Sequence, residues 1–211
     1  MSELRPLVVK VGGGLLRDGG LEGLRRACAE ATELADRRPV LVVPGGGPFA
    51  DAVRAVDALV GLADDVAHVL ALRAMDQLGE LVRELLPAAE VLAGLVVPRG
   101  LAVLQAEPAF RDRPEVPPSW AVTSDSLAVL AAAAIGAGEA VLLKPVPGVL
   151  ARWPSDSPPL PALTADELQA LQERGDGGAV DAYLPEAVRR TGVAVVVRAP
   201  GGTAGTRITG A

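Results

Sequence analysis

The chain has 211 residues, of which half are hydrophobic, and a formal net charge of −6, so residues 1–211 suit one domain with a sizeable core. No block of like charge stands out, which argues against DNA or RNA as the partner, because phosphate backbones are bound by clustered Lys and Arg. The single cysteine, Cys28, excludes an intramolecular disulfide, and the absence of a signal-peptide pattern or of an apolar run long enough for a membrane helix favours a cytoplasmic protein.

The first half of the chain alternates apolar strands with helices. Two buried strands, at 6–11 and 39–44, each run into a glycine loop. Apolar residues at helical spacing predict three helices, over 20–37, 48–60 and 65–86. Short strand-like runs follow within 90–104.

The second half repeats this alternation between two proline-rich loops, at 107–118 and 151–162. Between them the pattern predicts a short strand, a turn at 123–126, an Ala-rich helix ending at Gly136 and Gly138, and a buried strand with a turn over 139–150. After the second loop come a capping box at 164–167 that opens a short helix, a helix over 181–191 and a final strand over 192–199. Such alternation predicts an α/β fold with a mostly parallel sheet covered on both faces, whose ligand crevice lies at the carboxyl ends of the strands.

The two glycine loops are the strongest local features. They read "KVGGG" at 10–14 and "PGGG" at 44–47. Glycine lets the backbone approach a ligand, and successive N–H groups beside a helix N-terminus attract anions. One such loop could be merely a tight turn, but two after neighbouring strands favour a polyphosphate. Neither loop matches the P-loop or the dinucleotide fingerprint.

The lysines are equally distinctive. Of 20 Lys and Arg residues only Lys10 and Lys144 are lysine, and each lies at the carboxyl end of an apolar strand. A lysine offers a compact, mobile charge that the planar arginine fork cannot replace. We expect the two side chains to converge on one crevice as phosphate-holding cations. The alternative is that both lysines occur there by chance and extend to the surface without a functional role.

Asp125 and His68 have two interpretations each. Asp125 follows Thr123 and Ser124 at a helix start, where an acid suits the first turn, or it lies between the two lysines or binds Mg²⁺. His68, the only histidine, is either a structural or solvated helix residue or part of the site. No zinc-ligand spacing and no nucleophile elbow is present.

Four segments, in order, resemble the amino acid kinase superfamily: "VVKVGGG", "VVPGGGPFAD", "VTSDSLAVLAAAA" and "AVLLKPVPGVL", with a tail that looks like its closing strand. Within it, "PGGGPFADAVR", a His followed by "ALRAMDQLGELV", and "WAVTSDSLA" resemble the branch that includes the kinase of methanofuran biosynthesis, which phosphorylates an aminomethylfuran-methyl phosphate.

The resemblance implies a three-layer α/β/α sandwich with a mainly parallel sheet of about eight strands, ATP and Mg²⁺ as cofactors, a small phosphate-bearing acceptor and a homo-oligomer. Carried over by motif, Lys10 would hold the transferring phosphoryl group, Asp125 would orient the lysine side chains, and Lys144 would be a further catalytic residue. The implied phosphate and nucleotide site comprises Gly12, Gly13, Gly14, Lys144 and Gly148. The implied acceptor site comprises Gly45, Gly46, Gly47, Phe49, Arg54, His68, Thr123 and Ser124, and Gly12, Gly13, Gly45 and Gly46 would donate backbone N–H groups.

Two segments depart from the superfamily pattern. "PVPG" at 145–148 has prolines where several members have the acids of "DVDG", and "GGAVDAY" at 177–183 offers Asp181 where many have a late lysine, a role that Lys144 could take over. Two alternatives therefore stay open: a non-catalytic nucleotide- or oxyanion-binding member of the fold, and a kinase for another acceptor such as uridylate, isopentenyl phosphate or an amino acid.

Overall fold

A computed structural model describes residues 5–210 as a mixed sheet of eight strands between layers of helices. The strands are β1 (Leu7–Val11), β2 (Val40–Pro44), β3 (Glu90–Leu92), β4 (Leu101–Leu104), β5 (Glu139–Leu143), β6 (Ala162–Thr164), β7 (Ala194–Arg198) and β8 (Thr206–Thr209). The helices are α1 (Gly13–Ala35), α2 (Gly47–Val60), α3 (Asp64–Leu85), α4 (Ala106–Phe110), α5 (Ser124–Ala134), α6 (Ala165–Glu173) and α7 (Leu184–Thr191).

The strand order is β3-β4-β2-β1-β5-β7-β8-β6, and every neighbouring pair is parallel except β7 with β8. Strand β1 is central, since it pairs with β2 on one side and β5 on the other, with Lys10 opposite Val43 and Leu142. The carboxyl ends of β1, β2 and β5 therefore meet at one edge of the sheet. The predicted α/β sandwich with a mainly parallel sheet is confirmed.

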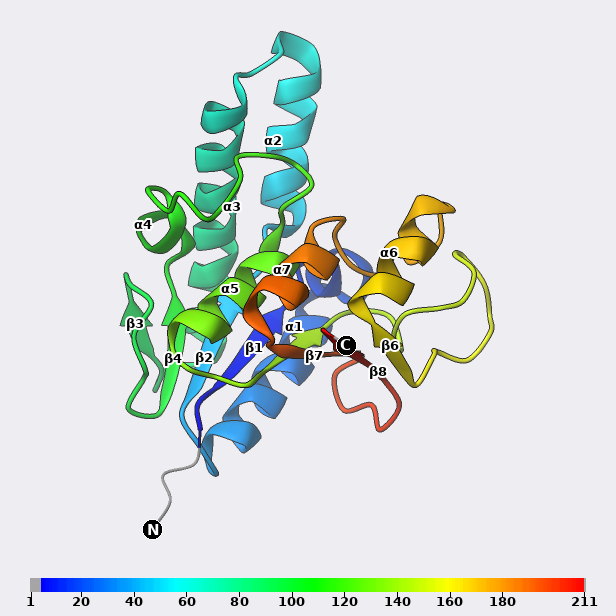
Figure 1. The fold of residues 1–211 in the computed structure, drawn as a ribbon. Coiled ribbons are helices and arrows are strands. Elements are labelled where there is room, and N and C mark those ends of the chain that lie inside the picture. Colours follow the sequence, from blue (N-terminus) through cyan, green and yellow to red (C-terminus); the bar gives the residue numbers. More distant parts are fainter. Residues whose placement is uncertain (1–4, 211) are drawn as a thin grey trace.

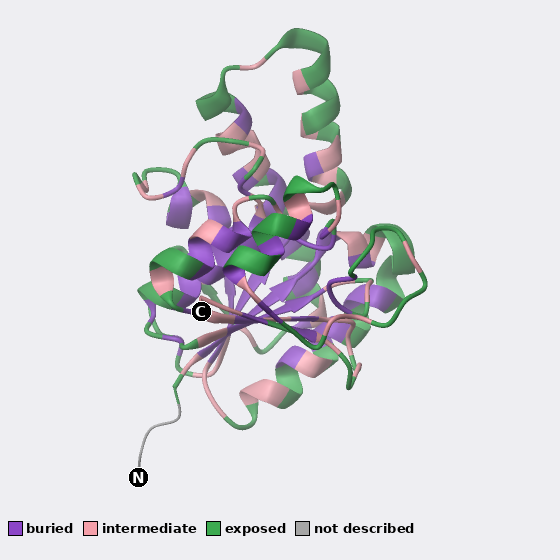
Figure 2. Ribbon diagram, turned by 45° about the vertical axis from the view of Figure 1, so that its right-hand side comes forward, coloured by how far each residue is buried: buried purple, intermediate pink, exposed green. Residues whose placement is uncertain are grey.

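The two faces of the sheet pack against different helices (Figure 1). On one face, Leu7 and Val9 join a cluster with Leu24 and Cys28 of α1. On the other face, Val8 joins a cluster that includes α5 and α7. Helices α2 and α3 form a hairpin that rises beyond the sheet, and its far end is exposed, whereas the central strands β1 and β2 are buried (Figure 2). None of the helices within residues 5–210 combines the length and the apolarity that a membrane crossing needs.

Several element boundaries differ from the sequence predictions. The backbone of α1 breaks at Gly20 (φ 58°, ψ −153°), so the helix expected from residue 20 is the part of α1 after this break, and a helical segment over residues 13–19 precedes it. The short strand expected before residue 123 is instead a turn, in which the Val122 N–H donates to the Ser119 carbonyl (3.1 Å). The expected turn at 123–126 is the first turn of α5, and α7 begins at Leu184 rather than at residue 181.

Short elements account for the other differences. Only Glu90–Leu92 of the run after residue 90 is a strand before β4, α4 occupies part of the first proline-rich loop, and the end of the second loop pairs with β8 as β6. The predicted capping box is confirmed, with Thr164 and Glu167 each accepting from the backbone N–H of the other. Elements of three to five residues carry too little periodicity to stand out in a sequence.

Candidate active site

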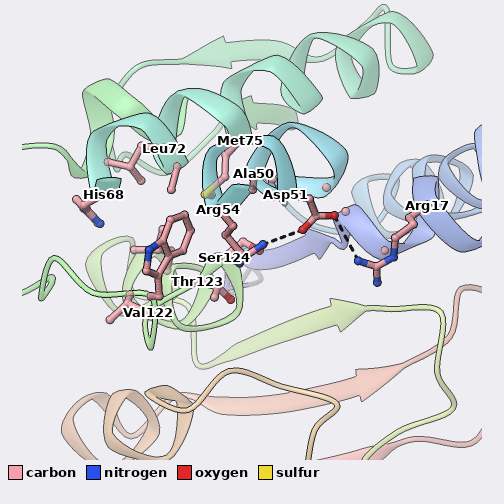
Figure 3. Close-up of a pocket in the computed structure, with 17 residues that line it drawn as sticks. Arg17, Ala50, Asp51, Arg54, His68, Leu72, Met75, Val122, Thr123 and Ser124 are labelled. Atoms are coloured by element: carbon pink, nitrogen blue, oxygen red, sulfur yellow. Dashed lines mark hydrogen bonds and ion pairs between the residues drawn. The ribbon is translucent and has the colours of Figure 1, made fainter. Parts of the chain in front are cut away.

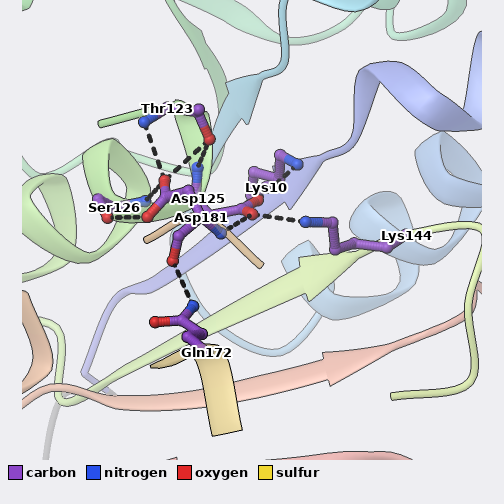
Figure 4. A network of polar contacts seen from close by, with 7 residues as sticks. All are labelled: Lys10, Thr123, Asp125, Ser126, Lys144, Gln172 and Asp181. Atoms are coloured by element: carbon purple, nitrogen blue, oxygen red, sulfur yellow. Dashed lines mark hydrogen bonds and ion pairs between the residues drawn. The ribbon is translucent and has the colours of Figure 1, made fainter. Parts of the chain in front are cut away.

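The two lysines of the chain meet at one carboxylate. The Lys10 Nζ lies 2.7 Å from Asp125 Oδ1, and the Lys144 Nζ lies 2.5 Å from Asp125 Oδ2. Figure 4 shows Asp125 between the two ammonium groups, with Asp181 beside it. The predicted convergence of the lysines is confirmed. All three side chains are largely withdrawn from solvent, with exposed fractions of 5% for Lys10, 3% for Asp125 and 16% for Lys144.

Burial and charge oppose each other in this network. Burial lowers the pKa of Lys10, although the neighbouring Asp125 charge raises it in part. Burial alone would raise the pKa of Asp125, but the charges of Lys10 and Lys144 outweigh it, so that the pKa falls below its usual 3.8. Burial, followed by the Asp125 charge, raises the pKa of Asp181. Asp125 is therefore a stable anion that holds two cations close together.

Strand alternation and helix capping explain why these residues meet. Side chains alternate along a strand, so Lys10 points to the same face as Val8, the face covered by α5. Thr123 is the N-cap of α5, and its hydroxyl accepts from the Asp125 N–H (3.4 Å). The cap places Asp125 in the first turn of α5, directly above the carboxyl ends of β1 and β5. Both interpretations of Asp125 thus hold at once: it is a first-turn acid and it lies between the lysines.

Two glycines of the first loop leave no space for a side chain. A Cβ at Gly13 would lie 2.1 Å from the Gly47 nitrogen, and one at Gly12 would lie 2.7 Å from the Leu143 oxygen and 3.3 Å from the Lys10 Nζ. The N–H groups of Gly12 and Gly45 already donate to the carbonyls of Leu143 (3.0 Å) and Val11 (2.8 Å). The donors that remain for a ligand are those of the first turns of α1 and α2, which have no carbonyl within their own helix.

A cavity of about 160 Å³ opens in front of these loops (Figure 3). The N-termini of three helices border it, through Gly13 of α1, Gly47 of α2 and Ser124 of α5. Its lining residues are Gly13, Gly14, Arg17, Gly46, Gly47, Ala50, Asp51, Arg54, His68, Ala71, Leu72, Met75, Trp120, Val122, Thr123, Ser124 and Leu127. The first turns of α1 and α2 contain no acidic residue, so the positive ends of these two helix dipoles favour an anion at the glycine end of the cavity.

The lysine network lies directly behind the cavity wall. Gly13 lines the cavity while Gly12, its neighbour, lies against the Lys10 ammonium group. Ser124 also lines the cavity, while the next residue, Asp125, binds both lysines. A group bound at the glycine end of the cavity would thus lie close to the two cations.

One wall of the cavity carries a chain of ion pairs. Asp51 lies between Arg54 (2.9 Å) and Arg17 (3.5 Å), as Figure 3 shows. The Arg54 guanidinium also stacks on the Trp120 ring, 4.8 Å from its centroid, and the Trp120 indole N–H donates to Asp57 Oδ2 (2.7 Å). Burial lowers the pKa of His68, which therefore favours its neutral form in the cavity wall.

The structure brings together most of the predicted site residues, though in two groups. Lys10, Asp125 and Lys144 form the network. The predicted residues that line the cavity are Gly13, Gly14, Gly46, Gly47, Arg54, His68, Thr123 and Ser124. Gly12 and Gly45 lie behind the loops, Phe49 packs on the core cluster of α1, and Gly148 is buried against Thr206 and Pro159, away from the cavity.

Sequence reasoning missed Arg17, Asp51 and Trp120 as cavity residues. Arg17 belongs to the first turns of α1, a position that was hidden by placing the helix start at residue 20. Trp120 is one of only two tryptophans and stands three residues before Thr123, which is a signal that could have singled it out. Its partner Asp57 lies 63 positions away, and only the folded chain shows that contact.

Metal-binding groups are sparse in the part of the chain that the structure describes. No cluster of three or more His, Cys, Asp or Glu side chains within residues 5–210 could hold a metal ion. Both Asp125 oxygens face ammonium groups, an environment that disfavours a cation. These residues do not form a magnesium site of their own.

Known proteins share this sequence pattern and this fold. The sequence profile described as "Amino acid kinase family" matches residues 5–101 and 98–198. The (5-(aminomethyl)furan-3-yl)methyl phosphate kinase of Methanocaldococcus jannaschii is 28% identical over 154 residues, which is 70% of this chain and 69% of that protein.

Solved structures match over nearly the whole chain. Aspartate kinase from Synechocystis superposes with a TM-score of 0.74 at 19% identity over 98% of this chain, which spans only 40% of that protein. Uridylate kinase from Archaeoglobus fulgidus gives a TM-score of 0.72 at 21% identity and covers 96% of this chain and 99% of its own. The profile match extends over most of the sequence, and the chain belongs to the amino acid kinase family.

Proposed function

We propose that this kinase transfers the terminal phosphoryl group of ATP to a small acceptor that already carries a phosphate. The observation that carries the proposal is the Lys10–Asp125–Lys144 network directly behind a cavity bordered by three helix N-termini. Two buried cations beside an anion-favouring cavity suit a reaction between two phosphate groups. The two arginines that line the cavity, Arg17 and Arg54, share one lining carboxylate, Asp51, and this excess of positive charge suits an acceptor that carries a phosphate.

The proposed chemistry is charge neutralisation and positioning. In the transition state of phosphoryl transfer, negative charge spreads over the oxygens of the transferring group, and the protein forms no covalent bond to it. Lys10, fixed beneath Gly12, would neutralise the transferring group, and Lys144, which is more exposed, would bind the donor side. Asp125 would keep the two ammonium groups from separating, so that the site needs little reorganisation during the reaction.

The glycine end of the cavity is the proposed site of the acceptor phosphate. The first-turn N–H groups of α1 and α2 would bind its oxygens, with Arg17 or Arg54 as the countercharge. Leu72 and Met75 add an apolar part to the cavity lining, which suits the flat body of a small ring. The nucleotide would bring Mg²⁺ on its own phosphate oxygens, because the described residues provide no carboxylate cluster for it.

The acceptor we propose is an aminomethylfuran-methyl phosphate, as in methanofuran-type cofactor synthesis. Its support is the similarity to the archaeal furan phosphate kinase. Uridylate is the rival acceptor, since uridylate kinase shares the fold.

The test offers the purified protein ATP with the furan phosphate, with uridylate, or with aspartate, and follows products by phosphorus NMR. We expect a diphosphate signal from the furan phosphate at a rate at least about tenfold above the other two acceptors. Equal or faster phosphorylation of uridylate would refute the furan assignment and leave the kinase assignment standing. No transfer to any acceptor, together with no binding of ATP, would favour the non-catalytic alternative.

A further inference from the structure

Asp181 is a buried carboxylate that accepts four hydrogen bonds. It lies three residues before α7, in the segment 177–183. Its Oδ2 accepts from the Thr123 N–H (2.9 Å), the Thr123 hydroxyl (2.8 Å) and the Ser126 N–H (3.0 Å). Its Oδ1 accepts from the Ser126 hydroxyl (2.5 Å). All four donors belong to the N-terminus of one helix, α5 (Figure 4).

This contact works as a second N-cap supplied from another part of the chain. The cap of α5 itself, Thr123, reaches only the Asp125 N–H, and at the long distance of 3.4 Å. Asp181 satisfies the Ser126 N–H, which has no partner within the helix, and its negative charge lies at the positive end of the helix dipole. The first turn of α5 is therefore fixed by a carboxylate 55 to 58 positions away.

Asp181 also contacts the lysine network directly. Its backbone N–H donates to Asp125 Oδ2 (3.2 Å), the same oxygen that binds Lys144. The segment is anchored in turn, since Gln172 donates to the Asp181 carbonyl (2.9 Å) and the Tyr183 N–H donates to the Ala121 carbonyl (3.2 Å). With Asp181 the buried group contains two lysines and two aspartates, so its charges balance when all four are ionised. Without it, the group carries one uncompensated positive charge.

From these contacts we infer that Asp181 is a positioning residue, which holds the first turn of α5 so that Asp125 reaches both lysines and which supplies the fourth charge of the network. The inference rests on the proposed kinase function and deepens it. It gives the segment 177–183 a structural role: Asp181 organises the site in which Lys144 serves as the second cation.

Lysine NMR tests the inference without relying on activity. Because the chain has only two lysines, lysine labelled at Cε gives two side-chain signals, which Lys144→Arg assigns. The Asp181 charge opposes the lowering of the Lys10 pKa by burial, so Asp181→Asn should lower that pKa further, which a pH titration of the Lys10 signal measures. Asp176→Asn is the matched control: Asp176 lies in the same segment, where it accepts from the Trp153 N–H (3.0 Å), and it should leave the Lys10 titration unchanged.

Steady-state kinetics provide the second readout. Asp181→Asn should lower kcat by about 10- to 100-fold while the acceptor KM stays within about twofold, because positioning errors act on the transition state. Ser126→Ala removes one donor and keeps the charge, and should give a smaller loss of kcat with an unchanged Lys10 pKa. If Asp181→Asn fails to fold, the kcat of Ser126→Ala tests the positioning role of Asp181 instead.

The outcomes distinguish the positioning role of Asp181 from the proposed kinase function. A wild-type Lys10 titration and a wild-type kcat in Asp181→Asn would overturn the inference, whatever the acceptor. Unchanged kcat in Ser126→Ala, with an Asp181→Asn protein that does not fold, would likewise reduce Asp181 to a residue for stability alone. A wild-type protein that transfers no phosphate would refute the proposed function, and the Lys10 signal in Asp181→Asn would then decide the positioning role by itself.

Discussion

The lysine network and the cavity wall differ in how far their charged side chains are exposed to solvent. In the lysine network, the charges are buried and paired, and the Asp125 side chain is only 3% exposed. In the cavity wall, Arg17, Asp51 and Arg54 are linked as well, yet their side chains are 58%, 44% and 46% exposed. Exposed ion pairs contribute little and rearrange easily, whereas breaking a buried pair is costly. The lysine network is therefore suited to hold the reacting groups in a fixed geometry. The side chains of the cavity wall can rearrange, which suits them to substrate binding.

Removal of the Lys10 charge should have the largest effect. Lys10→Met keeps the length of the side chain, and we expect kcat to fall about 1,000-fold or more, because the transferring group loses its buried countercharge. Steady-state transfer from ATP measures this. Lys10→Arg should also lose most activity, since the space beneath Gly12 holds a compact ammonium group and not a planar fork. An active Lys10→Arg protein would contradict the fixed geometry.

Loss of the shared carboxylate should mainly reduce stability. Asp125→Asn leaves Lys10 and Lys144 buried without it, and we expect the free energy of unfolding at pH 7 to fall by about 3–5 kcal/mol. Urea denaturation measures the loss. The control is Asp51→Asn, which breaks the exposed chain of ion pairs and should cost less than about 1 kcal/mol. Equal losses of unfolding free energy in Asp125→Asn and Asp51→Asn would contradict the proposed difference between buried and exposed ion pairs.

The stability effect of Asp125 should also depend on pH. The folded-state pKa of Asp125 lies below 3.8, so its contribution is fully present above that pH and is lost as the pH falls towards the folded-state value. The difference between wild type and Asp125→Asn should therefore be constant from pH 7 down to about 5 and shrink below pH 3.8. A difference that shrinks between pH 7 and 5 would mean that Asp125 is not held as an anion by the lysines.

Changes in the cavity wall should act on binding alone. Arg54→Gln should raise the acceptor KM about tenfold and leave kcat within about threefold, since a half-exposed charge contributes a moderate share of anion binding. Arg25→Gln, on the exposed side of α1, is the matched control and should change neither parameter. A loss of kcat in Arg54→Gln without a change in KM would place Arg54 in the chemistry instead.

The smallest expected effect concerns the Trp120 indole. Trp120→Phe keeps a ring for Arg54 and removes the hydrogen bond to Asp57, at a cost of about 1 kcal/mol. Thermal unfolding should then show a Tm lower by about 2–4 °C with nearly unchanged kcat. A large fall in kcat would show that the turn before α5 acts on the network.

The sequence predicted best those features that depend on strand order and spacing. The lysines converge because parallel neighbouring strands end at one edge, and the sequence contains both the strands and the residues. It could not place Trp120 against Asp57 or Asp181 against α5, because these contacts join distant segments through the folded core. The sequence did not predict the helical segment over residues 13–19, before the break at Gly20, because glycine has a poor helix propensity and the packing of Gly13 against Gly47 overrides that preference. The homo-oligomer stays a prediction, since assembly depends on contacts between chains.

Calorimetric titration of the acceptor phosphate into Lys10→Met and Arg54→Gln tests most directly whether catalysis and acceptor binding depend on different parts of the site. If the network performs the chemistry and the cavity wall performs the recognition, Lys10→Met binds the acceptor with a Kd within about threefold of wild type although it does not turn over. Arg54→Gln should bind it about tenfold more weakly. Weaker binding to Lys10→Met than to Arg54→Gln would contradict this account of the site.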